Sequence, residues 1–186
     1  KKAGTSKHFA SHNLDYCTTP DPKHDWESSH RESNFDDPND TLHGTSDGFL
    51  RVNDDHEDTM NYYNEADLPY YYALAQTFAI SDRMFSSLIG PTLPNRLYLL
   101  AATSFGHVVT GGEITPPAQG YMPVAGTIFD LLSKAEVSWT NYYDPATTTD
   151  STVIPARPYG GLFFPQAMVV PPHFKTMDEF FNDAAA

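Results

Sequence analysis

The pattern of hydrophobic and polar positions predicts four helices in the second part of the chain. The first begins around Asp67 and Pro69, two residues typical of a helix start, and its apolar positions recur at helical spacing: Leu68, Tyr71, Tyr72, Ala75 and Phe78. Residues 97–102, 127–135 and 177–186 predict the other helices. Pro94 marks the first turn of the helix that contains residues 97–102.

Two further runs predict strands. Apolar side chains outnumber polar ones in residues 78–85, which is typical of a buried strand, and residues 137–143 predict a second strand. Residues 145–173 hold six prolines and predict an irregular loop. Because helices alternate with strands after residue 66, the pattern favours an α/β layered architecture.

Residues 1–66 lack this periodicity. Turn-forming clusters interrupt them at residues 19–22, 37–40 and 44–48, so we predict a loop-rich segment. This segment holds 14 acidic residues, 6 basic residues and six of the eight histidines. A length of 186 residues suits a single domain, within which we distinguish a loop-rich acidic segment, 1–66, from a helix and strand section, 67–186.

The composition argues against several classes of protein. Hydrophobic residues make up 40% of the chain, enough to form a core, which argues against global disorder. The net charge of −13 argues against binding to nucleic acid or to an anionic membrane, because phosphate groups attract clustered Lys and Arg. The longest apolar run, residues 97–102, is far shorter than the roughly 20 residues of a transmembrane helix. Cys17 is the single cysteine, which permits no disulfide within the chain.

The most informative segment for function lies between the predicted strand at 78–85 and the helix at 97–102. It reads G-P-T-L-P-N-R over residues 90–96, so we expect Thr92 where a strand turns into a helix. Free backbone N–H groups and the positive end of the helix dipole favour a phosphate, and the alkoxide form of a hydroxyl, at such a position. Thr92 is therefore a candidate nucleophile for phosphoryl transfer, and the alternative is that its side chain only caps the helix.

A second pattern consists of His and carboxylate groups at short spacing: Asp21, His24, Asp25, Glu27 and His30. Such groups can bind a metal, and a protonated histidine can neutralise a phosphate oxygen. No established metal-binding motif occurs among them. On spacing alone, solvated side chains in an acidic loop are therefore the preferred interpretation.

A third pattern places Ser46 at the centre of G-T-S-D-G, residues 44–48, which matches the nucleophile elbow of α/β-hydrolases. A nucleophile elbow follows an apolar strand and opens a helix, and neither flank of this segment shows the required pattern. We interpret the match as one of chance, and a serine hydrolase that uses Ser46 is the least favoured alternative.

Three segments together resemble the phosphoesterase family of bacterial phospholipases C and acid phosphatases, which belongs to the alkaline-phosphatase-like superfamily. They are residues 17–26 (C-T-T-P-D-P-K-H-D-W), 67–75 (D-L-P-Y-Y-Y-A-L-A) and 90–96 (G-P-T-L-P-N-R). The similarity is ordered along the chain and extends from about residue 16 to about residue 182.

The resemblance implies an alkaline-phosphatase-like α/β fold and metal-dependent hydrolysis of phosphate esters or phospholipids. In that family the Ser or Thr of G-P-[ST]-x-P-N is both the nucleophile and a metal ligand, which corresponds to Thr92. The His of D-P-x-H-x-W helps to hold the substrate phosphate, which corresponds to His24. The family further implies a divalent metal ion, of an identity that the sequence does not specify, and a secreted or periplasmic location.

The chain also departs from the family pattern. The family's E-N-x-S-F-D element, which supplies metal ligands, does not occur before Cys17, and the acidic ligands and histidines of the family's C-terminal segment have no counterpart. Because hard cations need several oxygen ligands, Thr92 alone would not retain a metal. We therefore expect an interior portion of a longer enzyme. The alternative is a non-catalytic fragment that lacks the metal site.

Overall fold

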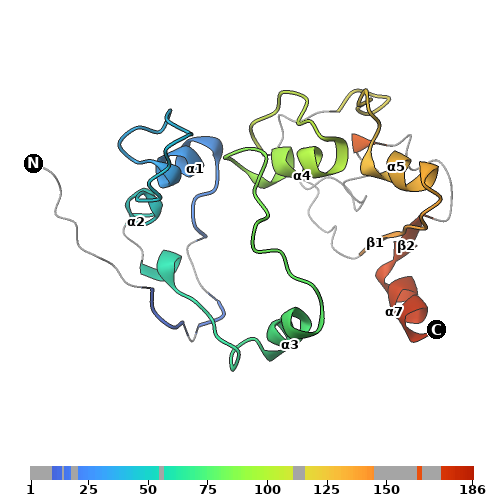
Figure 1. Ribbon diagram of the computed structural model, residues 1–186, viewed down its shortest axis with the longest axis horizontal. Coiled ribbons are helices and arrows are strands. Elements are labelled where there is room, and N and C mark those ends of the chain that lie inside the picture. Colours follow the sequence, from blue (N-terminus) through green and yellow to red (C-terminus); the bar gives the residue numbers. More distant parts are fainter. Residues whose placement is uncertain are drawn as a thin grey trace, which may run out of the picture. The chain divides into compact units, whose positions relative to one another are not determined.

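The computed structural model of the chain describes residues 10–13, 15–17, 21–54, 57–110, 116–144, 163–164 and 173–186 (Figure 1). The chain divides into two compact units, Lys1–Pro91 and Thr92–Ala186. Within the described residues most elements are helices, and the sheet has two strands. The presence of both helix and strand agrees with the sequence, and a layered α/β arrangement stays a prediction.

The first unit contains α1 (Trp26–Ser33), α2 (Phe49–Val52), the 3₁₀ helix η1 (Glu57–Met60) and α3 (Pro69–Thr77). Helix α1 begins because the Asp25 carboxylate accepts the Ser28 N–H at 3.0 Å, while Glu27 lies in the first turn, where the helix dipole favours an acidic side chain. The described part of the predicted loop-rich segment 1–66 therefore also contains three short helices, α1, α2 and η1. The apolar pattern does not mark α1, because only Trp26 in this helix is apolar.

A buried polar pair joins α1 to the residue that follows α2. Glu32 and Asn53 are 8% and 6% exposed, and the Glu32 carboxylate accepts the Asn53 Nδ2–H at 2.8 Å. Asn53 also donates to the Phe49 carbonyl and accepts the Lys23 N–H at 2.6 Å. Burial raises the pKa of Glu32, with Asp25 adding to this rise, while the Asn53 bond and His24 act in the opposite direction.

Replacing Glu32 with Gln is expected to stabilise the protein at neutral pH. A carboxyl group whose pKa is raised by folding contributes most to stability when it is protonated, and that contribution is lost as the pH rises through its folded-state pKa, above 4.5. Gln keeps the acceptor for Asn53 without the buried charge. Urea denaturation should show Glu32→Gln to be more stable than the wild type at neutral pH, with a difference that shrinks in acid. A wild type that is the more stable form at neutral pH would contradict this account.

Helix α3 confirms the helix predicted after residue 66, but not its cap. The N-cap residue is Leu68, which makes no side-chain cap bond. The Asp67 carboxylate instead accepts the Asn64 N–H at 2.7 Å and contacts His12 Nε2 at 2.6 Å. Asp67 therefore fastens the N-terminal segment, whose His12 forms an isolated parallel bridge with Tyr62, and does not start the helix.

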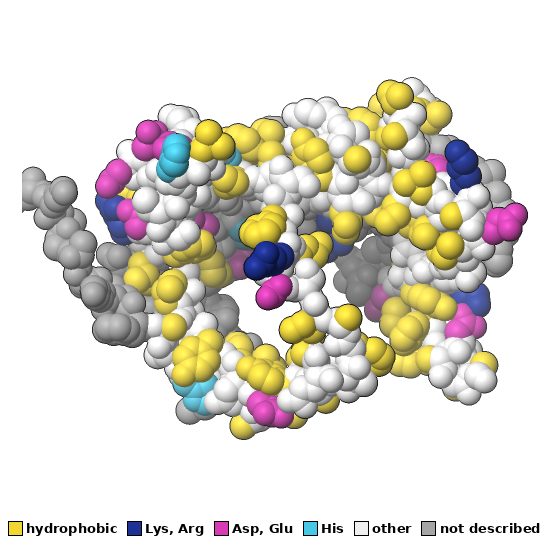
Figure 2. Space-filling view, in the orientation of Figure 1, with side chains coloured by type: hydrophobic (Ala, Val, Ile, Leu, Met, Phe, Trp, Pro, Cys, Tyr) yellow, Lys and Arg dark blue, Asp and Glu magenta, His cyan; other side chains and the backbone are white. Residues whose placement is uncertain are grey.

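The strand predicted at residues 78–85 is wrong for this structure. These residues follow α3 without regular structure, and all of them are exposed. Their large apolar side chains are 66% to 84% exposed: Phe78, Ile80, Met84 and Phe85. Figure 2 shows hydrophobic side chains on the viewed surface around α3. A strand needs a neighbouring strand for its backbone groups, and no described segment pairs with these residues.

The second unit is built on α4 (Thr92–Ala101), whose buried face forms its core. This core consists of Leu93, Leu97, Ala101, Tyr121, Phe163 and Phe164. Helix α5 (Ile128–Lys134) confirms the helix predicted at 127–135, because Thr127 and Asp130 form a reciprocal capping box at its start. Helix α7 (Met177–Ala185) confirms the last predicted helix, and Thr176 with Glu179 forms its capping box.

The sheet of the second unit pairs β1 (Asn141–Tyr143) with β2 (Phe174–Thr176) in parallel. Strand β1 is shorter than the predicted strand at 137–143. Asn141 lies opposite Phe174, and the connection between the strands is long enough for a parallel crossover. Most of the predicted loop at 145–173 lies outside the described residues.

Candidate active site

Helix α4 positions Thr92, which is its first residue and is exposed. Leu93, Leu97 and Ala101 recur at a spacing of four and are buried, so one face fixes the helix to the core. Pro94 lies in the first turn, where its missing N–H breaks no helical bond. The sequence therefore predicted correctly that Thr92 lies at a helix start, although the preceding segment is not a strand.

The hydroxyl of Thr92 does not cap α4. Pro91 precedes the helix and has no side-chain acceptor. The Leu93 N–H lies in the first turn and therefore has no acceptor within the helix. It donates to Thr110 Oγ1 at 3.2 Å. Among the described residues, the Thr92 hydroxyl has no hydrogen-bond partner. The structure therefore does not support the alternative in which Thr92 only caps the helix.

Thr110 carries no sequence signal of its own, since it lies 17 residues after Leu93 and belongs to no motif. The signal that could have found it is indirect. Pro91 cannot cap α4 with its side chain, and Pro94 has no N–H to occupy a cap. The first amides of such a helix bond to solvent or to an acceptor from another segment.

His24 lies two residues before α1 and is exposed. Its Nδ1 donates to the Pro22 carbonyl at 2.8 Å, so the ring carries a proton on Nδ1 and leaves Nε2 available to a ligand. Asp21 Oδ2 lies 3.6 Å from the same Nδ1. His24 belongs to the first unit and Thr92 to the second.

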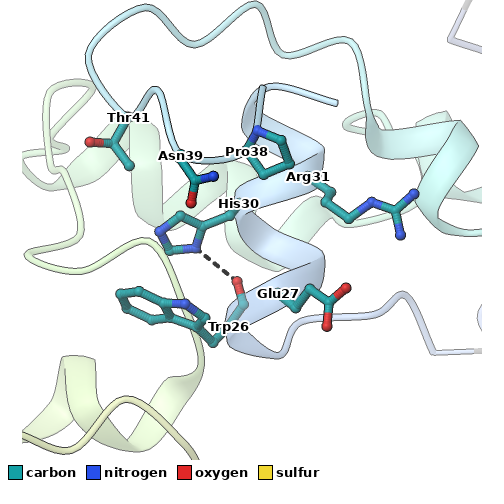
Figure 3. A pocket seen from close by; sticks show the side chains of 7 residues that line it. All are labelled: Trp26, Glu27, His30, Arg31, Pro38, Asn39 and Thr41. Atoms are coloured by element: carbon teal, nitrogen blue, oxygen red, sulfur yellow. Dashed lines mark hydrogen bonds between the residues drawn. The ribbon is translucent and has the colours of Figure 1, made fainter. Parts of the chain in front are cut away.

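A pocket of about 580 Å³ lies beside α1 (Figure 3). The His30 and Trp26 rings lie 4.1 Å apart, and His30 Nδ1 donates to the Trp26 carbonyl at 2.8 Å. The remaining lining residues come from α1 and from the loop after it: Glu27, Arg31, Pro38, Asn39 and Thr41. His24 does not line this pocket, so the histidine of the pocket is His30 and not the one that the resemblance selects.

Trp26 also packs against Gly90. A Cβ atom on Gly90 would lie 3.2 Å from Trp26 Cε3 and 3.4 Å from Leu88 Cδ2, closer than ordinary van der Waals contact for the first of these atoms. Trp26 ends the D-P-x-H-x-W element and Gly90 begins the G-P-T element. The structure therefore brings together two segments on which the family resemblance rests.

The described residues contain no group of three or more His, Cys, Asp and Glu that could hold a metal ion. Hydrogen bonds from the Ser28 backbone N–H and hydroxyl lower the pKa of Asp25, and both bonds belong to the cap of α1. Asp21, His24 and Glu27 are exposed, which agrees with solvated side chains in this segment.

The G-T-S-D-G loop contacts the C-terminal end of α1. The Ser46 N–H donates to the Ser33 carbonyl at 2.7 Å, and the Gly48 N–H donates to the Glu32 carbonyl at 3.1 Å. Both acceptors are carbonyls of the last helical turn, which need such partners. The four-residue α2 follows, a helix the sequence did not predict, but no strand precedes the loop in residues 34–43. Packing on α1 thus explains the loop, in agreement with a chance match to the nucleophile elbow.

The similarity of this chain to known proteins includes the residues of the candidate site. The chain matches the Phosphoesterase family over residues 2–181. It is 34% identical over 140 residues to Phospholipase C A of Mycobacterium tuberculosis (strain ATCC 25618 / H37Rv), which covers 69% of the chain and 25% of that protein. Hemolytic phospholipase C of Pseudomonas aeruginosa is 31% identical over 119 residues, covering 64% of the chain and 14% of that protein. Non-specific phospholipase C6 of Arabidopsis thaliana is 39% identical over 93 residues, covering 50% and 17%.

The chain thus spans a quarter or less of the length of these relatives. None of the helices in the described ranges is both long enough and apolar enough to cross a membrane. The family match includes the segments at residues 17–26, 67–75 and 90–96 and nearly all of the chain besides. The chain therefore belongs to the phosphoesterase family and is homologous to phospholipases C.

Proposed function

We propose that the protein carrying this chain hydrolyses phosphate esters, phospholipids among them, through a covalent phospho-threonine at Thr92. The observation that carries the proposal is the placement of Thr92, exposed at the first residue of α4 with a hydroxyl that no described residue engages. Membership of the phosphoesterase family and homology to proteins named phospholipase C support the substrate class.

The reaction would proceed in two displacements at phosphorus. In the first, a bond forms between Thr92 Oγ1 and phosphorus, the ester P–O bond breaks, and the leaving alcohol takes up the proton that the hydroxyl gives up. In the second, water attacks the same phosphorus, the Oγ1–P bond breaks, and Thr92 recovers its proton from the water. The positive end of the α4 dipole favours the negative charge on the oxygens in both steps.

His24 would hold the substrate phosphate through its Nε2, because its Nδ1 is engaged by the Pro22 carbonyl. The family further implies a divalent metal, for which Thr92 would supply one oxygen ligand. The described residues do not fit such an ion by themselves, since no group of three or more ligating side chains occurs among them.

We base the proposed fold, the domain organisation and the cellular location of the protein on its resemblance to the phosphoesterase family. Residues 1–186 would form part of a single alkaline-phosphatase-like α/β domain, with the nucleophile in the section that follows the acidic residues 1–66. The protein would act outside the cytoplasm, secreted or in the periplasm.

During turnover of a phosphate ester, we expect phosphate to accumulate on Thr92. Acid quenching followed by mass spectrometry of the peptides locates the modified residue. Replacing His24 with Ala should slow this phosphorylation by about one to two orders of magnitude without moving it to another residue, because a group that holds the phosphate is lost.

The results of this experiment distinguish the phosphoesterase from a non-catalytic fragment and from a serine hydrolase. Turnover without phosphate on Thr92 would contradict the assignment of Thr92 as the nucleophile. A non-catalytic fragment predicts neither turnover nor phosphorylation. A serine hydrolase predicts carboxyl-ester hydrolysis that disappears in Ser46→Ala.

A further inference from the structure

Two prolines, Pro91 and Pro94, flank the first residues of α4. Thr92 and Leu93 each carry a backbone N–H, whereas Pro94 has none. Pro91, which precedes the helix, has no side-chain acceptor. The N–H groups at such a helix start bond to water or to a partner from another segment. Thr110 Oγ1 is such a partner, accepting the Leu93 N–H at 3.2 Å.

The segment after α4 brings Thr110 back to the start of the helix. Ten helical residues extend over about 15 Å, so residues 102–110 must turn at the far end and run back along α4. The turn uses left-handed backbone at Ala102, Phe105 and Gly106, with φ of 56°, 55° and 83°. Thr103 Oγ1 accepts the Phe105 N–H at 3.0 Å within this turn.

His107 and Phe105 fasten the returning segment to the core. His107 Nε2 lies 2.6 Å from Tyr121 Oη, and the Phe105 ring stacks on Tyr121 at 4.3 Å between centroids. Tyr121 is 8% exposed and belongs to the same buried cluster as Leu93. The segment is therefore held to the core just before Thr110, which limits where the Thr110 side chain can lie.

We propose that Thr110 is a positioning residue for the nucleophile Thr92, an inference that rests on the proposed function. Its hydroxyl holds the amide of the peptide bond that joins Thr92 to Leu93, and thereby sets the orientation of the backbone that carries the Thr92 side chain. Attack at phosphorus requires the oxygen to be aligned, and a displacement of about 1 Å lowers the rate by about 10²-fold. Thr110 acts through this peptide bond and needs no contact with the substrate.

The test compares Thr110→Val and Thr110→Ser in the complete protein that carries this chain. Valine keeps the shape of the side chain but removes the acceptor, so kcat should fall about tenfold while KM stays within about twofold. Serine restores the acceptor and should return kcat to within about threefold of the wild type. Hydrolysis of a soluble phosphate ester supplies both constants.

Thr103→Val is the matched control, because it removes a threonine-to-backbone bond at the opposite end of the same helix. It should lower the Tm as much as Thr110→Val does and leave kcat unchanged. Equal falls in kcat for the two variants would overturn the positioning role.

Should Thr110→Val unfold at the assay temperature, Thr110→Cys replaces it, because sulfur is a weaker acceptor. A kcat below that of Thr110→Ser then supports the role, and an equal kcat overturns it.

Thr92→Val distinguishes the failure of this inference from the failure of the proposed function. If Thr92→Val abolishes hydrolysis and Thr110→Val leaves kcat unchanged, Thr92 remains the nucleophile and the role of Thr110 is refuted. If Thr92→Val retains the hydrolysis of the wild type, both proposals are refuted.

Discussion

Thr92→Val in the complete protein should lower kcat for phosphate ester hydrolysis by at least about 10³-fold. Valine matches the shape of threonine but has no oxygen to bond to phosphorus. Thr92 is exposed, and the buried side chains beside it on α4, Leu93 and Leu97, stay in place. The bond to Thr110 also stays, because it uses the Leu93 amide. Assays with a monoester and a diester measure the loss.

Thr92→Ser is the matched control, since it retains a hydroxyl at the same position. It should keep turnover within about tenfold of the wild type. An unchanged Tm in both variants shows that the fold is intact. Full turnover by Thr92→Val, or equal loss in Thr92→Val and Thr92→Ser, would refute the assignment of the hydroxyl as the nucleophile.

Gly48→Ala should destabilise the first unit by about 3 kcal/mol or more. A Cβ atom at Gly48 would lie 1.9 Å from the Arg31 carbonyl oxygen and 2.7 Å from Glu32 Cα, and neither backbone atom can move without distorting α1. Hydrogen exchange followed by mass spectrometry should show faster exchange across residues 26–53. Exchange in residues 92–101 of the second unit should not change.

Gly44→Ala tests the same loop with a milder contact. A Cβ atom at Gly44 would lie 2.7 Å from Ser33 Oγ, the end of a side chain that can rotate away. Its cost should stay below about 1 kcal/mol. Similar effects for the two alanine variants would contradict the close approach of Gly48 to α1.

Two of the helices that the sequence predicted, α4 and α5, carry start signals of their own. Thr127 and Asp130 lie three residues apart and form the capping box of α5, and Pro94 marks the first turn of α4. Such signals act within one turn, so they can be read from neighbouring residues. Helix α1 has a local signal as well, in the Asp25 cap, but its polar sequence hides it from a search for apolar periodicity.

The prediction of a strand at residues 78–85 was wrong because strand pairing, unlike a local helix cap, depends on a second segment of the chain. The apolar content of this segment agrees with a buried strand, yet Phe78, Ile80, Met84 and Phe85 are exposed. Apolar composition describes the environment that a segment can occupy. Pairing depends on a second segment with free backbone groups, and no segment in the described ranges supplies one.

The sequence by itself determined the family, through three ordered motifs, and the location of Thr92 at the start of a helix. Only the tertiary structure decided that the Thr92 hydroxyl is not the helix cap, that Thr110 caps Leu93, that Trp26 packs on Gly90, and that Gly48 approaches the backbone of α1. Sequence motifs and helix caps such as that of Thr127 on α5 depend on residues a few positions apart, whereas the contacts of Thr110, Trp26 and Gly48 join separate segments of the chain. They form only when packing brings those segments together, so local spacing does not encode them.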